Sequence, residues 1–136
     1  VATPEEMASD DAPLLAGWFR ERLGLRVTVP DYSPAGIHLL GGRIAEMRGR
    51  PAAYLLYEKG HILMSVFMVP GVRFAPDGTR AVAYRGATYY TTEVNGQRAV
   101  VWADGERVFG LVSALDYDGL LECADRLRSA RASERA

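Results

Sequence analysis

Hydrophobic positions are densest between Ala52 and Val69, where two apolar runs flank a polar break at Glu58-Lys59-Gly60. Each run has the length of a strand and is rich in β-branched and aromatic residues. Gly60 can adopt the positive φ that a tight reversal requires. The pattern therefore predicts a central β-hairpin. Because both runs are apolar on both faces, we expect helix to cover at least one side of it.

A helix is predicted on each side of the strands. Near the N-terminus, Asp11 is a good N-cap, Pro13 suits the first helical turn, and Gly24 ends the helix. Near the C-terminus, Asp116 or Asp118 caps a second helix. The apolar positions of both follow helical spacing: Leu14, Leu15, Trp18, Phe19 and Leu23 in the first, and Leu120, Leu121, Ala124 and Leu127 in the second. We expect residues 1–9 to form a flexible lead-in and residues 129–136 a flexible tail.

Further strands are predicted on either side of the hairpin. Turn pairs at Asn95-Gly96 and Asp104-Gly105 indicate a three-stranded meander, and the glycine pair Gly41-Gly42 indicates a bulge. Residues 70–80 are irregular, and we expect a mobile loop there. The predicted strands are Arg26–Val29, Ile37–Met47, Ala87–Val94, Gln97–Trp102 and Arg107–Val112. This order predicts one α+β domain over residues 10–128, a mostly antiparallel sheet with an N-terminal and a C-terminal helix packed on it.

Composition narrows the function classes. The chain has 136 residues, which suits one domain with a sizeable core. Its 16 Lys and Arg balance 17 Asp and Glu, so charge gives no case for nucleic acid as a partner. No apolar run approaches the roughly 20 residues of a membrane span. The chain starts at Val1 rather than Met, so we expect a fragment of a longer protein, although a processed N-terminus would look the same.

Few residues suggest catalytic or metal chemistry, and we predict no catalytic residue, cofactor or metal site. His38 and His61 could join Met64 and Met68 in a soft metal site. Strand alternation places His61 on the opposite side from both methionines, which favours core packing instead. Cys123, the only cysteine, is interpreted as a small buried hydrophobe.

Two clusters are candidate surfaces. The aromatic residues Tyr84, Tyr89, Tyr90 and Trp102 either occupy ordinary sheet faces or form a ligand or partner surface. The second cluster surrounds a turn and consists of Arg43, Arg48 and Arg50. We interpret it as a solvent-exposed edge rather than an anion-binding site.

Three stretches of the chain, taken in order, carry a family resemblance. They are Trp18–Gly24 with Val29-Pro30-Asp31, Gly36–Arg43 with Gly49–Ala53 and Leu55–Tyr57, and Val100–Gly105 with Phe109–Leu115. Together they resemble the extracytoplasmic C-terminal domain of bacterial transmembrane anti-sigma factors. The chain departs from that family at Gly110 and Ala114, where the family often has Trp and Asp. The resemblance implies a non-enzymatic regulatory or sensor domain that takes part in signal transduction and transcription regulation. It also implies a periplasmic or other extracytoplasmic location, anchored to the inner membrane by the parent protein.

The same resemblance implies partners and a mechanism. A sigma factor would bind a missing N-terminal domain of the parent, and an unknown extracytoplasmic signal or protein would act on this domain. Signalling of this kind requires a two-state element, and we expect it at residues 70–80 or at the lead-in to Pro13. The signal would release the sigma factor, either through the membrane helix or by exposing the chain to proteolysis.

Two alternatives stay open. One is a free-standing small-molecule-binding or enzymatic α+β domain with a pocket between sheet and helix, lined by Tyr54, Tyr57, Tyr89 and Trp102. The other is a structural domain that forms a homodimer through an exposed sheet edge.

Overall fold

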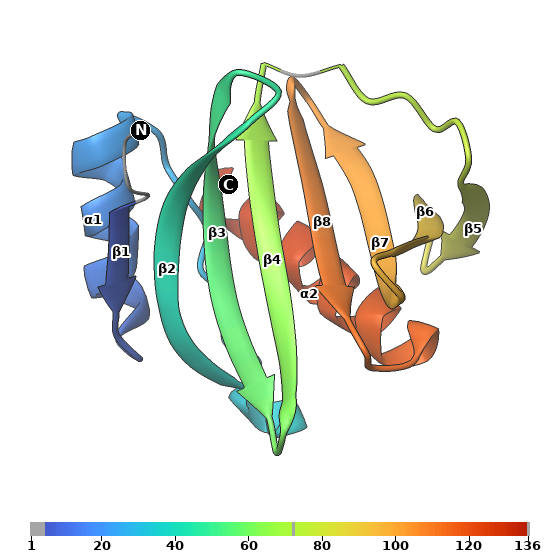
Figure 1. Ribbon diagram of the computed structural model, residues 1–136, viewed down its shortest axis with the longest axis horizontal. Helices are drawn as coiled ribbons and strands as arrows, with labels where there is room; N and C mark the ends of the chain where they lie inside the picture. Colours follow the sequence, from blue (N-terminus) through green and yellow to red (C-terminus); the bar gives the residue numbers. More distant parts are fainter. Residues whose placement is uncertain (1–4, 72, 136) are drawn as a thin grey trace.

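Eight antiparallel strands form one sheet, and both long helices lie against the same face of it (Figure 1). The computed structural model describes residues 5–71 and 73–135. The α+β class predicted from the sequence is confirmed. The elements are β1 (Glu5–Ala8), α1 (Ala12–Leu23), the 3-10 turn η1 (Ser33–Ala35), β2 (His38–Met47), β3 (Arg50–Lys59), β4 (Ile62–Pro70), β5 (Arg80–Tyr84), β6 (Ala87–Val94), β7 (Gln97–Asp104), β8 (Arg107–Ser113) and α2 (Tyr117–Arg135).

The sheet joins two four-stranded meanders. Its strand order is β1-β2-β3-β4-β8-β7-β6-β5, so β4 of the first meander pairs with β8 of the second. The connection from β4 therefore has to reach the far edge strand β5, and Figure 1 shows it running across the top of the sheet. The sheet consequently has two edge strands, β1 and β5.

Local sequence signals account for the ends of the helices and for several turns. The Asp11 side chain accepts a hydrogen bond from the Leu14 amide at 3.1 Å, and Gly24 ends α1 in the left-handed conformation at φ 67°. Asp116 accepts from the Gly119 amide at 2.8 Å at the start of α2. The predicted central hairpin is confirmed as β3 and β4, and β2 carries the predicted irregularity between Leu39 and Gly41.

The hydrophobic core lies between the sheet and the helices. Leu15 and Phe19 of α1 and Leu120 of α2 are completely buried there. They pack with apolar side chains from the covered face of the sheet, among them Val66 and Leu111. Burial of this continuous apolar layer is the main force that holds both helices on one face.

The two ends of the chain are more ordered than the sequence predicted. Residues 1–4 and 136 lie outside the described residues. Glu5–Ala8, however, pair with β2 because Gly41 leaves room for the β1 backbone. The predicted tail continues α2 to Arg135. Contacts from this last part anchor it: Arg131 forms an ion pair with Asp104 at 3.2 Å, and Glu134 accepts from the Thr28 hydroxyl at 2.8 Å.

Two strand assignments also differ. The segment Arg26–Val29, predicted as a strand, pairs with no described strand and is held by side chains of β8 and α2. Arg107 donates to the Arg26 carbonyl at 2.9 Å, in addition to the bond from Thr28 to α2. Strand β5 was not predicted at all. No helix in the described part of the chain is long and apolar enough to cross a bilayer.

Candidate functional site

The helix-free face of the sheet carries a continuous row of opposed side chains. Strand register places each member directly opposite the next, across all eight strands. We call this set the transverse row. Its members, from one edge to the other, are Glu6, Arg43, Tyr54, Phe67, Gly110, Val101, Tyr90 and Ala81.

The transverse row is aromatic near its middle. The Phe67 ring lies over Gly110, where an added Cβ would be only 2.2 Å from the ring. The Tyr54 and Phe67 ring centroids are 6.1 Å apart, which is the range of tilted aromatic pairs. The lack of a side chain at Gly110 thus makes room for an aromatic surface on the face that no helix covers.

The four aromatic residues predicted to line one pocket are divided between the two faces. Tyr54 lies on the helix-free face, while Tyr57, Tyr89 and Trp102 are almost completely buried on the helix side. The Tyr57 hydroxyl donates to the Pro30 carbonyl at 2.7 Å. Burial raises the pKa of Tyr57 and of Tyr89. The structure therefore brings only Tyr89 and Trp102 together, with ring centroids 5.5 Å apart. Tyr57 packs against Tyr32 elsewhere in the core, and Tyr54 lies on the other face.

Trp102 is a special case within that buried group. Its ring stacks on Phe109 at 5.6 Å and meets Tyr89 edge-on at 5.5 Å. Its indole nitrogen is the only fully buried side-chain N or O without a hydrogen-bond partner in the described part of the chain. The burial of Trp102 and its two ring contacts are those of a core residue.

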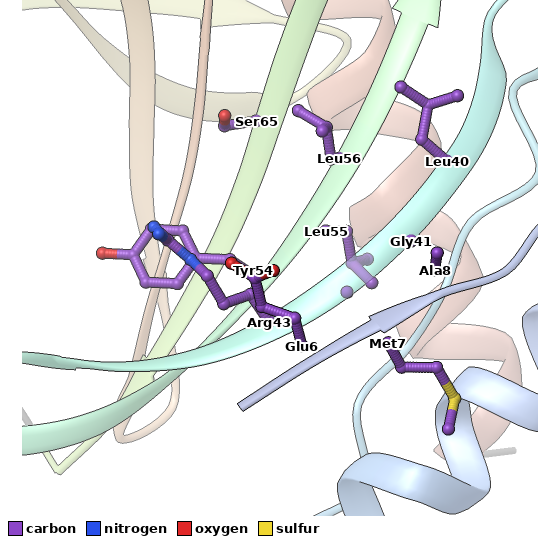
Figure 2. Close-up of a pocket in the computed structure, with 11 residues that line it drawn as sticks. Glu6, Met7, Ala8, Leu40, Gly41, Arg43, Tyr54, Leu55, Leu56 and Ser65 are labelled. Atoms are coloured by element: carbon purple, nitrogen blue, oxygen red, sulfur yellow. The ribbon is translucent and has the colours of Figure 1, made fainter. Parts of the chain in front are cut away.

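Tyr54 instead borders a groove on the helix-free face, next to β1 (Figure 2). The groove has a volume of about 390 Å³. Figure 2 shows a polar end with Glu6, Arg43 and Tyr54 and an apolar end with Leu40 and Leu56. Strands β1, β2, β3 and β4 all contribute to its lining. The groove therefore lies where the first edge strand meets the body of the sheet.

The positive charge in the groove comes from Arg43. Its guanidinium lies over the Tyr54 ring, 5.1 Å from the centroid, in a cation–π contact. Within the described residues no carboxylate forms an ion pair with Arg43. Glu6 lies opposite Arg43 on β1, but the two side chains form no ion pair. Partial burial raises the pKa of Tyr54, and the Arg43 charge opposes this shift. Tyr54 therefore stays a neutral hydrogen-bonding group at physiological pH.

The glycine pair at the groove has two separate roles. A Cβ on Gly41 would lie 2.5 Å from the Met7 carbonyl oxygen and 3.0 Å from the Ala8 Cα, both in the β1 backbone. A Cβ on Gly42 would lie 2.8 Å from the Phe19 ring of α1. Gly41 thus allows β1 to dock, and Gly42 allows α1 to dock.

The other residues considered from the sequence do not come together. His38 and His61 are exposed, whereas Met64 and Met68 are buried. No group of three or more His, Cys, Asp or Glu within the described residues could hold a metal ion. Burial raises the pKa of the Cys123 thiol to about 11.

A polar cluster that the sequence did not predict fixes β5 and β6 to α2. The Tyr84 hydroxyl donates to Glu122 at 2.8 Å, and the Tyr89 hydroxyl donates to Asp125 at 3.3 Å. Arg128 donates to the same Asp125 carboxylate at 3.2 Å. These partners lie more than 30 residues apart along the chain, except for Arg128 and Asp125, so no local pattern indicates them.

Protein-family models, curated proteins and solved structures were each compared with this chain, and none gave a significant match.

Proposed function

We propose that this chain is the sensor domain of a membrane-anchored anti-sigma factor, a regulatory protein that controls transcription by sequestering a sigma factor. In this proposal the domain lies in the periplasm or otherwise outside the cytoplasm. The sigma factor binds an N-terminal domain of the parent protein, and the sensor domain catalyses no reaction. The resemblance of three sequence stretches to that family supports the proposal.

The observation that carries the proposal is the position of Gly41 and Gly42. These glycines belong to one of the stretches that resemble the family. In the structure they hold the two N-terminal elements, since Gly41 accommodates the β1 backbone and Gly42 accommodates the Phe19 ring of α1. The two glycines thus hold the sheet against the N-terminal elements, which are the part of the chain nearest the proposed membrane span.

Strand β1 has the properties of a two-state element. It has four residues, lies at a sheet edge, and pairs only with β2. A short edge strand opens locally at a small fraction of the free energy of global unfolding. In our proposal a signal changes the docked population of β1, and this change passes along the chain towards the membrane and the sigma-binding domain.

The parent protein provides the test. Sigma-factor binding is measured for the complete parent, for the parent without residues 5–135, and for the parent with Gly41→Ala. We expect both changes to alter sigma binding, because each removes the docked state of β1. Gly17→Ala is the control, since a Cβ at Gly17 would meet nothing within 4 Å. Unchanged sigma binding in the deletion variant would refute the proposal.

A free-standing ligand-binding domain is the second candidate, and the groove beside β1 is the observation that favours it. The groove differs from the pocket expected from the sequence, because it lies on the helix-free face and includes Tyr54 alone of the four predicted residues. Ligand binding by the isolated chain, combined with a parent that has no effect on any sigma factor, would favour this candidate over the first.

A further inference from the structure

We propose that the groove beside β1 binds a small amphiphile with one anionic group, which pairs with Arg43 while its apolar body lies against Leu40 and Leu56. The idea that this ligand acts as a signal rests on the proposed function. The binding itself does not, because it is a property of the isolated chain and is tested on that chain.

The position of Arg43 over Tyr54 leaves its donors available for an anion. The guanidinium carbon lies 5.1 Å from the ring centroid, a cation–π contact that occupies none of the N–H groups in a hydrogen bond to an oxygen. Among the described residues no side-chain hydrogen bond from Arg43 is found, so its N–H groups can form a bidentate contact with a carboxylate or phosphate. Among the described residues none forms an ion pair with Arg43. The tyrosine ring also restricts the side chain, which lowers the entropy lost on binding.

Glu6 limits the affinity of the groove for an anion. It lies opposite Arg43 on β1 and lines the same groove. Its carboxylate repels an incoming anion, although it is exposed and therefore screened by solvent. Removal of the Glu6 charge should consequently strengthen binding, whereas removal of the Arg43 charge should weaken it. A purely apolar site would show neither effect.

The remainder of the groove suits an apolar body. Leu56 keeps 36% of its surface exposed, which is unusual for a leucine at the middle of a sheet. Leu40 lies beside it, and the small apolar side chain of Ala8 completes this end of the groove. The volume of about 390 Å³ lies within the range of about 300–1,000 Å³ typical of small-molecule sites.

The ligand would also act on β1. Glu6, Met7 and Ala8 all line the groove, together with residues of β2, β3 and β4. A molecule that contacts Met7 and Ala8 as well as the body of the sheet loses those contacts when β1 leaves. Where these contacts outweigh the repulsion from Glu6, the ligand binds the docked state more tightly and stabilises it by mass action. This deepens the proposed function, because it names the chemical class of a signal that β1 could report.

The experiment titrates the isolated chain with octanoate, and with octyl phosphate in a parallel arm. Methyl octanoate is the neutral analogue. Binding is followed by calorimetry and by amide NMR shifts. We expect saturable binding, with shifts at Gly41, Leu56 and Ser65 and slower exchange of the Ser9 amide, which bonds to the Leu40 carbonyl. The arm with tighter binding distinguishes a carboxylate from a phosphate headgroup.

The variants test the recognition itself. We expect Arg43→Gln to weaken octanoate binding at least about tenfold, the effect of losing a charge-assisted hydrogen bond. Glu6→Gln should strengthen binding. Arg98→Gln is the control for loss of an arginine charge, because Arg98 also lies over a tyrosine ring, Tyr117 at 5.8 Å, but lies outside the groove. Its side chain donates to the Ala114 carbonyl, so the folding of this variant is checked by its amide spectrum. Absence of binding to both anions, equal binding of methyl octanoate, or equal effects of the two arginine variants would overturn the inference. Saturable binding without slower Ser9 exchange would overturn its signalling role alone.

Discussion

Replacement of Gly41 by alanine should detach β1 and leave the rest of the fold in place. The new Cβ would lie 2.5 Å from the Met7 carbonyl oxygen and 3.0 Å from the Ala8 Cα, where ordinary contacts begin at 3.4 Å. These are backbone atoms, so no side-chain rotation relieves the overlap. Strand β1 would have to retreat by roughly 1 Å, which takes its hydrogen bonds to β2 out of range.

The cost of this change has an upper limit. Strand β1 pairs with β2 at four positions, and each net backbone hydrogen bond contributes about 1 kcal/mol. Ordering of each β1 residue costs a similar amount of conformational entropy. Docking of β1 is therefore weakly favourable. Once β1 is released the overlap disappears, so we expect Gly41→Ala to lower the free energy of unfolding by no more than about 2 kcal/mol.

Hydrogen exchange measures this prediction at a defined atom. The Ser9 amide donates to the Leu40 carbonyl at 3.0 Å and should lose its protection in Gly41→Ala. Amides in the centre of β4 and β8 should keep theirs. Gly17→Ala should leave Ser9 protected and stabilise α1 by up to about 1 kcal/mol, because alanine is the better helix former.

Two results would refute this reasoning. If Ser9 stays protected in Gly41→Ala, the β1 backbone does not depend on the missing side chain. If the amides of β4 and β8 lose protection together with Ser9, then β1 is part of the global folding unit and cannot act as a separate two-state element.

Three further predictions concern the core and the α2 contacts. Tyr57→Phe should lower the free energy of unfolding in urea by about 1–3 kcal/mol, because it leaves the Pro30 carbonyl without its 2.7 Å partner. Tyr54→Phe breaks no described hydrogen bond and should be nearly neutral. Equal losses of stability in the two variants would contradict this. Cys123 should react with a thiol reagent only at the rate of unfolding, because burial raises its pKa to about 11, and rapid labelling of the folded chain would contradict this. Hydrogen bonds lower the pKa of Glu122, with the larger effect from the Tyr84 hydroxyl and the next from Arg126. The contribution of Glu122 to folding stability should therefore be complete above the ordinary Glu pKa and decline as pH falls through the lowered pKa. Glu122→Gln should flatten that acid limb of the stability profile, and an unchanged limb would rule out this contribution.

Much of the fold follows from local rules in the sequence. Helix α1 begins and ends where Asp11 and Gly24 place its caps, and the β6–β7 turn lies at Asn95-Gly96, where both residues have positive φ. The apolar runs of the central hairpin likewise identify β3 and β4. These signals are interactions between near neighbours, so a reader of the sequence can recognise them.

The edge strands could not be predicted in the same way. Strand β1 has four residues and β5 has five, too few to establish a period. They form because partner strands are available, and for β1 because Gly41 makes close approach feasible. A glycine pair in the sequence indicates such an approach but does not identify the segment that makes it.

The candidate site shows both what alternation predicts and what it cannot predict. Tyr54 and Tyr57 lie three positions apart on one strand, so alternation alone places them on opposite faces. The sequence interpretation grouped them by residue type and missed this. The position of Glu6 beside Arg43 and Tyr54 depends on pairing between β1, β2 and β3, and the sequence carries no local signal for that register.

The coding sequence immediately before Val1 gives the most direct test of the central claim. The account predicts an apolar span of roughly 20 residues, preceded by a small domain with His and Cys at metal-ligand spacing. Such a parent would place this chain outside the membrane, with β1 close to the span. A start codon or a plain signal peptide in that position would contradict the anti-sigma assignment.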